Sequence, residues 1–99
     1  MKRLDNIEEY NNIINNSLVF VIFYNTFHST MFVKDSYVKR LVENHPEVDF
    51  YGVNIDQLSD ILEDSEISKI PFISRFENGY EIKQISALAT LNELEEFIK

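Results

Sequence analysis

The chain has 99 residues, too few for two independent hydrophobic cores, so the sequence predicts a single domain over residues 1–99. Hydrophobic residues make up 44% of it, with eight Phe and five Tyr, which excludes an intrinsically disordered protein. The net charge of −8 excludes binding to nucleic-acid backbones and anionic membrane surfaces as an expected role, and no apolar run approaches the roughly 20 residues of a membrane span.

The first residues also bear on location. Residues 1–5 lead into acidic and Asn-rich sequence without the apolar stretch of a secretory signal peptide. We therefore expect a cytoplasmic protein.

The first two elements are expected to be a helix and a central strand. Asp5 and Glu8 have the spacing of a capping box, and apolar residues recur at helical spacing behind them, so the sequence predicts a helix over about residues 7–15. Residues 18–24 (LVFVIFY) are short, β-branched and aromatic. This composition is typical of a strand that is buried on both faces of a sheet.

A second helix and strand complete a βαβ unit. Residues 25–29 are expected to form a polar loop, and Ser29 or Thr30 can cap a helix that continues to about Asn44, where His45 and Pro46 end it. Residues 48–55 (VDFYGVNI) have the composition of a strand. A strand, helix and strand of this length predict parallel pairing through a right-handed crossover.

The last third of the chain is expected to form a short helix, a hairpin and a closing helix. The short helix is predicted over about residues 57–64. Asn78-Gly79 between two apolar runs predicts antiparallel strands over residues 72–76 and 80–86. Thr90 and Glu93 form a second capping box, which predicts an amphipathic helix at the end of the chain.

From about Leu18 onwards this sequence resembles the thioredoxin family. Four segments carry the likeness, namely 23–27 (FYNTF) for F-W-A-x-W, 53–56 (VNID) for V-[ND]-x-D, 70–71 (IP) at the family's cis-proline, and 76–79 (FENG) for F-x-N-G. Residues 28–31 (HSTM) stand where the family has C-G-P-C. The resemblance implies the thioredoxin fold, an α/β architecture with a mixed central sheet flanked by helices.

The departures from the family pattern concern its redox chemistry. The chain has no cysteine, and the thiol positions hold His28 and Met31 with Ser29 and Thr30 between them. Disulfide exchange needs sulfur nucleophiles, so these positions predict no catalytic residue. The family's buried acid aligns with Ile22 and its lysine partner with Gly52, which implies that the proton-transfer groups are gone as well.

The resemblance also implies where a partner binds. In this family the bond before the proline is cis and the preceding backbone can pair with an extended peptide, a form of strand addition. We therefore expect a non-catalytic protein-binding or adaptor module with no cofactor and no metal, whose partner is a protein or extended peptide. The groove is expected to be lined by Phe27, His28, Ile70, Pro71, Phe72, Ser86 and Ala87. Either Phe27, Ile70 and Phe72 form one exposed apolar patch, or Phe72 points into the core.

Two alternatives stay open, and a third, a metal site, is disfavoured. His28 at a helix N-terminus is a candidate for a non-thiol enzymatic activity or for ligand binding, with an exposed loop histidine as the plainer reading. His28 and Met31 alone make a poor site for a soft ion such as Cu(I). The acidic residues of the last two helices form either a solvated face or a docking face for a basic partner; they are Asp60, Glu63, Asp64, Glu66, Glu93, Glu95 and Glu96.

Overall fold

The computed structural model describes all residues 1–99. Its elements in chain order are β1 (Lys2–Arg3), α1 (Ile7–Ile13), β2 (Val19–Tyr24), the 3-10 helix η1 (Thr26–Phe32), α2 (Tyr37–Asn44), β3 (Phe50–Asn54), the 3-10 helix η2 (Ser59–Ile61), α3 (Asp64–Ile67), β4 (Phe72–Glu77), β5 (Tyr80–Ser86) and α4 (Leu91–Phe97). No helix among them combines the length and the apolar character that crossing a bilayer requires.

The strands form one mixed sheet in the order β1-β3-β2-β4-β5. β2 lies at the centre, where it pairs in parallel with β3 and antiparallel with β4. β4 and β5 form the antiparallel hairpin. The predicted fold is therefore confirmed, including the βαβ unit and the central position of β2.

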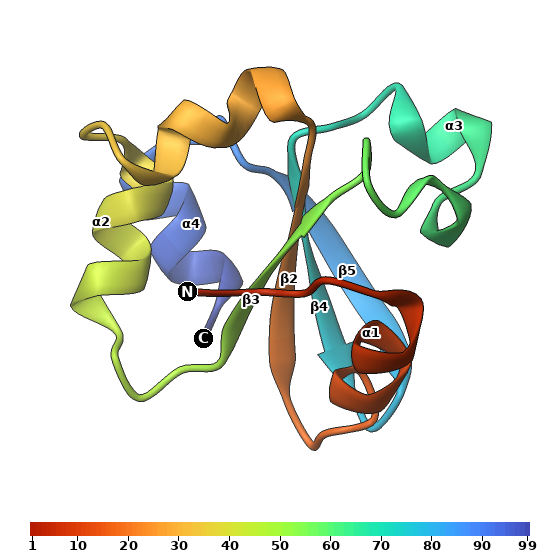
Figure 1. The fold of residues 1–99 in the computed structure, drawn as a ribbon. Coiled ribbons are helices and arrows are strands. Elements are labelled where there is room, and N and C mark those ends of the chain that lie inside the picture. The colour runs from red at the N-terminus through yellow and green to blue at the C-terminus, as the bar shows by residue number, and fades with distance from the viewer.

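Alternating side chains of β2 separate the core into two layers. Phe20, Ile22 and Tyr24 pack against α2 and α4, whereas Val19, Val21 and Phe23 pack on the other face, against α1 and the segment that contains η2 and α3. Figure 1 shows α2 and α4 together on one side of the sheet, with α1 and α3 on the other. All six side chains are at most 1% exposed.

The local signals near the C-terminus are confirmed. Asn78 and Gly79 adopt φ of 53° and 91°, the backbone of the two-residue turn that Asn-Gly favours. The Ile70–Pro71 peptide bond is cis. Thr90 caps α4, with Glu93 completing the capping box.

Several boundaries differ from the prediction. The cap of α1 is Asn6 rather than Asp5, because the Asn6 side chain accepts from the Glu9 backbone N–H at 2.9 Å and also donates to the Glu9 carboxylate. β1 was not expected, since a strand of two residues leaves no periodic pattern, and it pairs with β3 at the edge of the sheet. The helix predicted over residues 57–64 is replaced by the shorter η2 and α3.

The predicted second helix is divided into η1 and α2. Ser36 ends the connection between them, because its hydroxyl donates to the Met31 carbonyl at 2.5 Å and accepts from the Lys39 N–H at 3.1 Å. α2 therefore begins at Tyr37, with Ser36 rather than Ser29 or Thr30 as its cap. This break places residues 28–31 in a separate 3-10 helix at the end of β2.

Candidate functional site

The aligned thiol positions lie in η1, which a single side chain caps. Asn25 follows β2 directly, and its side-chain oxygen accepts from the His28 backbone N–H at 3.0 Å. The same N–H also donates to the Asn25 backbone carbonyl at 3.0 Å, so Asn25 holds the first turn of η1 through both its side chain and its backbone. Sequence reasoning assigned Asn25 to a polar loop, although Asn after a strand is a cap signal.

A second set of polar contacts ties η1 to the end of β3. The Asp56 carboxylate accepts from the Thr26 backbone N–H at 2.9 Å, and the Asn54 amide donates to the Thr26 hydroxyl at 3.1 Å. The hydrogen bonds from Thr26, first its backbone N–H and then its side chain, lower the pKa of Asp56. The VNID segment therefore fixes the position of the site, a role that its resemblance alone did not assign.

His28 has none of the partners that a catalytic histidine needs. Its ring lies edge-on to Phe27, with 5.6 Å between the ring centroids, and its buried Nδ1 has no hydrogen-bond partner. Ser29 donates its hydroxyl to the Thr26 carbonyl at 2.7 Å. His28 is therefore not part of a hydrogen-bonded chain of nucleophile, histidine and carboxylate.

The aligned proton-transfer positions face each other across two strands. Ile22 and Gly52 are register partners in the parallel pair of β2 and β3. Ile22 is 0% exposed. A Cβ on Gly52 would lie 2.9 Å from Met1 Cε and 3.2 Å from Tyr24 Cε1, so apolar groups now fill the space that a longer side chain would need.

The proline loop keeps one free backbone acceptor. The Pro71 carbonyl accepts from the Ala87 N–H at 3.0 Å, which joins the loop to the turn after β5. The Ile70 carbonyl accepts no hydrogen bond from within the chain. An extended segment lying against this loop would therefore find an acceptor at Ile70.

The predicted groove residues are only partly at the surface. Phe27 is 86% exposed, and His28 and Ile70 are half-buried. Phe72, in contrast, is 2% exposed and stacks on Phe23 with 4.9 Å between ring centroids. Of the two alternatives left open, the second holds: Phe72 points into the core, because it begins β4 on the face that α1 covers, and no exposed patch of Phe27, Ile70 and Phe72 forms.

The other predicted residues lie in the turn and in the loop. Pro71 and Ala87 are buried, and Ala87 contributes its backbone to the loop contact. Ser86 stays exposed and accepts from the Leu88 N–H at 3.1 Å. The predicted groove thus consists of Phe27, His28 and Ile70 around a buried proline, with Ser86 at the neighbouring turn.

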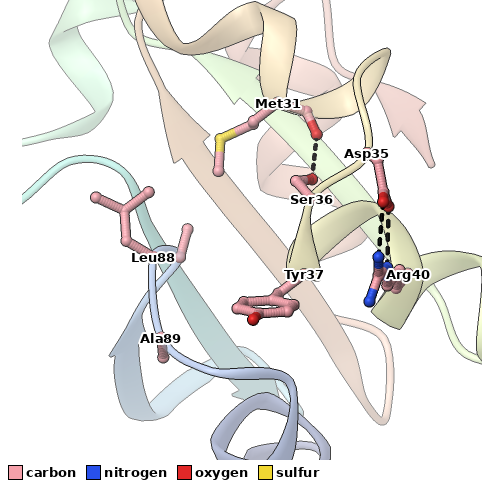
Figure 2. A pocket seen from close by; sticks show the side chains of 8 residues that line it. Met31, Asp35, Ser36, Tyr37, Arg40, Leu88 and Ala89 are labelled. Carbon is pink, nitrogen blue, oxygen red and sulfur yellow. Dashed lines mark hydrogen bonds and ion pairs between the residues drawn. The ribbon is translucent and has the colours of Figure 1, made fainter.

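A cavity beside η1 was not foreseen. It has a volume of about 400 Å³ and lies where the segment between η1 and α2 meets the turn before α4. Figure 2 shows Met31 and Tyr37 on one side of it, Leu88 and Ala89 on the other, and the Asp35–Arg40 ion pair at its edge. Leu88 is 71% exposed. An apolar residue in a turn of small and polar residues was the only sequence signal for this cavity.

The expected acidic face on the last two helices is not formed. α3 packs with the core layer that contains Val19 and Phe23, whereas α4 packs with the layer that contains Phe20 and Ile22, so their acids lie on opposite sides of the sheet. Several acids of α4 also have partners. Glu93 is part of the cap, Glu95 pairs with His45, and Glu96 pairs with Lys99.

Comparisons with known proteins agree with this architecture. The thioredoxin family model matches residues 3–99. Thioredoxin-1 of Saccharomyces cerevisiae is 30% identical over 73 residues, which cover 74% of this chain and 71% of that protein.

Two solved structures show the same fold. Mitochondrial thioredoxin 3 of Saccharomyces cerevisiae is 25% identical with a TM-score of 0.76, and the match covers 99% of this chain and 92% of the other. Plasmodium falciparum thioredoxin, 19% identical, has a TM-score of 0.79 over 99% of this chain and 96% of the other. The chain belongs to the thioredoxin family, and it does so without a thiol at either position that disulfide exchange requires.

Proposed function

We propose that this protein is a redox-inactive member of the family that binds another protein through an extended segment lying beside Pro71. The observation that carries the proposal is the free Ile70 carbonyl at the cis bond, next to the 86% exposed ring of Phe27. A backbone acceptor beside an exposed aromatic ring suits strand addition, in which main-chain hydrogen bonds provide affinity and side chains provide selectivity.

The pattern of loss and retention supports a binding role over a catalytic one. The thiol positions hold His28 and Met31, and their aligned proton-transfer positions hold Ile22 and Gly52. The contacts of Asn25 and Asp56 that hold η1 are present, and so is the Ala87 to Pro71 backbone hydrogen bond that holds the proline loop. These contacts keep η1 and the proline loop in the positions that binding a partner would require.

The test is affinity purification of the tagged protein from its source cells, compared with two single variants. Phe27→Ala removes the exposed ring beside the loop, and Tyr80→Ala removes a ring that is 74% exposed on β5. We expect at least one partner protein to bind the wild type and Tyr80→Ala but not Phe27→Ala. Thermal unfolding of all three proteins confirms that neither substitution disturbs the fold.

The proposal fails if no protein co-purifies, or if every co-purifying protein also binds Phe27→Ala. Ile70→Ala tests the groove at a second position, because it removes part of the apolar surface at the loop and leaves the free backbone carbonyl in place. A partner that contacts the groove is expected to bind this variant more weakly than the wild type.

A further inference from the structure

We propose that the bound segment is acidic and carries a bulky apolar side chain that enters the cavity between Met31, Tyr37 and Leu88. This inference rests on the proposed function and names the class of partner. It is argued from the shape of the cavity and from the charges around it.

The apolar part of the site lies close to the predicted groove. A smaller hollow of about 260 Å³ contains Phe27 and His28 and shares Met31 and Leu88 with the cavity of about 400 Å³. The two hollows are therefore neighbours, with Met31 and Leu88 in the wall of both. A segment that contacts Phe27 can place its next large side chain in the cavity that Met31, Tyr37 and Leu88 line (Figure 2).

The charges around these hollows are opposite to those of the molecule as a whole. The chain carries −8, yet residues 10–34 contain no Asp or Glu. Lys34 and Arg40 are the basic residues of the two linings, and Asp35 is their only acid. A carboxylate next to the apolar anchor would be attracted here and repelled by most other surfaces of the protein.

Arg40 holds Asp35 and keeps donors free. Its Nε and Nη2 donate to the two carboxylate oxygens at 2.9 and 2.6 Å, while Nη1 has no partner in the chain. Because a guanidinium has five N–H donors, a second carboxylate can be bound through Nη1. Asp35 and Arg40 therefore cancel in charge, and Lys34 gives the two linings their net positive charge.

The beginning of α2 adds to this preference. Ser36 and Tyr37, the cap and first residue of α2, line the cavity. The backbone N–H groups of Tyr37 and Val38 donate no hydrogen bond within the chain, and the first turn of α2 carries no acidic residue. A free helix N-terminus beside two basic side chains favours an anion over a cation.

The test uses three synthetic peptides and nuclear magnetic resonance of the ¹⁵N-labelled full chain. The peptides are Ac-GEFEG-NH₂, Ac-GQFQG-NH₂ and Ac-GKFKG-NH₂, which share one Phe anchor and differ in charge. We expect the acidic peptide to bind most tightly, by about tenfold over the neutral one at low salt, and to shift the amide signals of Tyr37, Arg40 and Leu88.

Two charge variants provide the control. Arg40→Gln is expected to remove most of the difference between the acidic and neutral peptides, whereas Lys2→Gln, which removes the same charge from the edge strand β1, is expected to keep it. Leu88→Ser is expected to weaken the binding of all three peptides equally, because it removes part of the apolar wall of the cavity.

The inference is overturned if the acidic peptide does not bind or if the basic peptide binds as tightly. It is also overturned if Lys2→Gln reduces the difference in affinity between the acidic and neutral peptides as much as Arg40→Gln does. Signals that move at Phe27 and Ile70 without regard to peptide charge would leave the proposed function standing and remove only the inference. The proposed function itself is tested separately, by the affinity purification that compares the wild type with Phe27→Ala.

Discussion

Ile22 and Gly52 illustrate how one position depends on its neighbour across the sheet. They are register partners on the face that α2 covers, and Ile22 is fully buried. A carboxylate at position 22 would lie in an apolar layer with no basic side chain opposite it. Since burying an unpaired charge is costly, the apolar pair is the stable arrangement once no thiol needs a proton acceptor.

Ile22→Asp is therefore expected to lower the free energy of unfolding by about 3–5 kcal/mol at pH 7. Burial favours the neutral acid, so the folded-state pKa of the new carboxyl lies above its unfolded value. The loss is then largest above the folded pKa and shrinks as the pH falls through it. Urea denaturation at several pH values measures both effects.

Ile22→Val serves as the control for this prediction. It removes one methylene without adding a charge, and we expect a loss of about 1 kcal/mol that does not change with pH. Equal losses for the Val and Asp variants at pH 7 would contradict the argument.

At the scale of elements, a polar pair connects the end of α2 to α4. His45, the C-cap of α2, contacts the Glu95 carboxylate through Nε2, with 2.9 Å to Oε2. Its Nδ1 lies 3.3 Å from Glu47 Oε1. The hydrogen bond to Glu95 is the main cause that raises the pKa of His45 above its ordinary value of 6.5, with Glu47 adding to it.

This pair predicts a pH dependence of stability. Because the folded-state pKa of His45 exceeds the unfolded value, its contribution is fully present below about pH 6.5 and is lost as the pH rises through the folded pKa. Glu95→Gln is expected to flatten this decline and to lower the His45 pKa. Denaturation between about pH 5.5 and 8.5 and a titration of the His45 ring signals provide the two measurements.

Glu47→Gln is the matched control, since it removes the second and longer contact of the same ring. Its effect on the His45 pKa should be the smaller one. If the two variants lowered the pKa equally, Glu95 would not be the principal partner.

The elements also show what the sequence could predict. The central strand, the Asn78-Gly79 turn and the Thr90 cap depend on neighbouring residues, so their signals are complete within a few positions. The break before α2 was missed because Met31 and Val38 keep helical spacing across it, while Ser36 marks the true start through one hydroxyl that serves two backbone groups.

The site was predicted less completely than the fold for a related reason. Phe72 was a candidate for the groove because its position after Pro71 is known from the pattern, but the face of β4 on which it lies is set by packing against Phe23. The cavity at Leu88 depends on two segments that are about 50 residues apart in the chain, and no local pattern joins them. Residues that act through tertiary contacts were thus the ones that sequence reasoning missed.

At the scale of the whole molecule, acidic residues lie on both sides of the sheet, whereas residues 10–34, which include η1, contain none. On the α1 side, burial and then the charges of Glu81 and Glu66 raise the pKa of Tyr10 to about 12. On the other side, the linings of the two hollows contain Lys34 and Arg40. The end at which η1 and α2 meet is therefore less acidic than the molecule as a whole.

Introducing two thiols tests whether this fold supports disulfide exchange without a buried proton acceptor. A His28→Cys and Met31→Cys double variant is expected to form a disulfide and yet to reduce insulin more slowly than yeast thioredoxin-1, by on the order of a hundredfold at pH 7, because Ile22 cannot accept a proton. The rate should rise with pH as the thiols ionise without help. Full activity at pH 7 in this variant would show that the proton acceptor is dispensable.

The close packing around Gly52 has a consequence for how such a protein can evolve. A side chain here would have to displace the end of the partly exposed Met1 side chain and fit closely against the buried Tyr24 ring, so a lysine at position 52 requires its neighbours to shift. An acid could return at position 22 only at a loss of stability unless that lysine were already present, and restored cysteines would gain little before both. Each of these substitutions gains little without the others, so thiol chemistry on this chain is difficult to build by single substitutions.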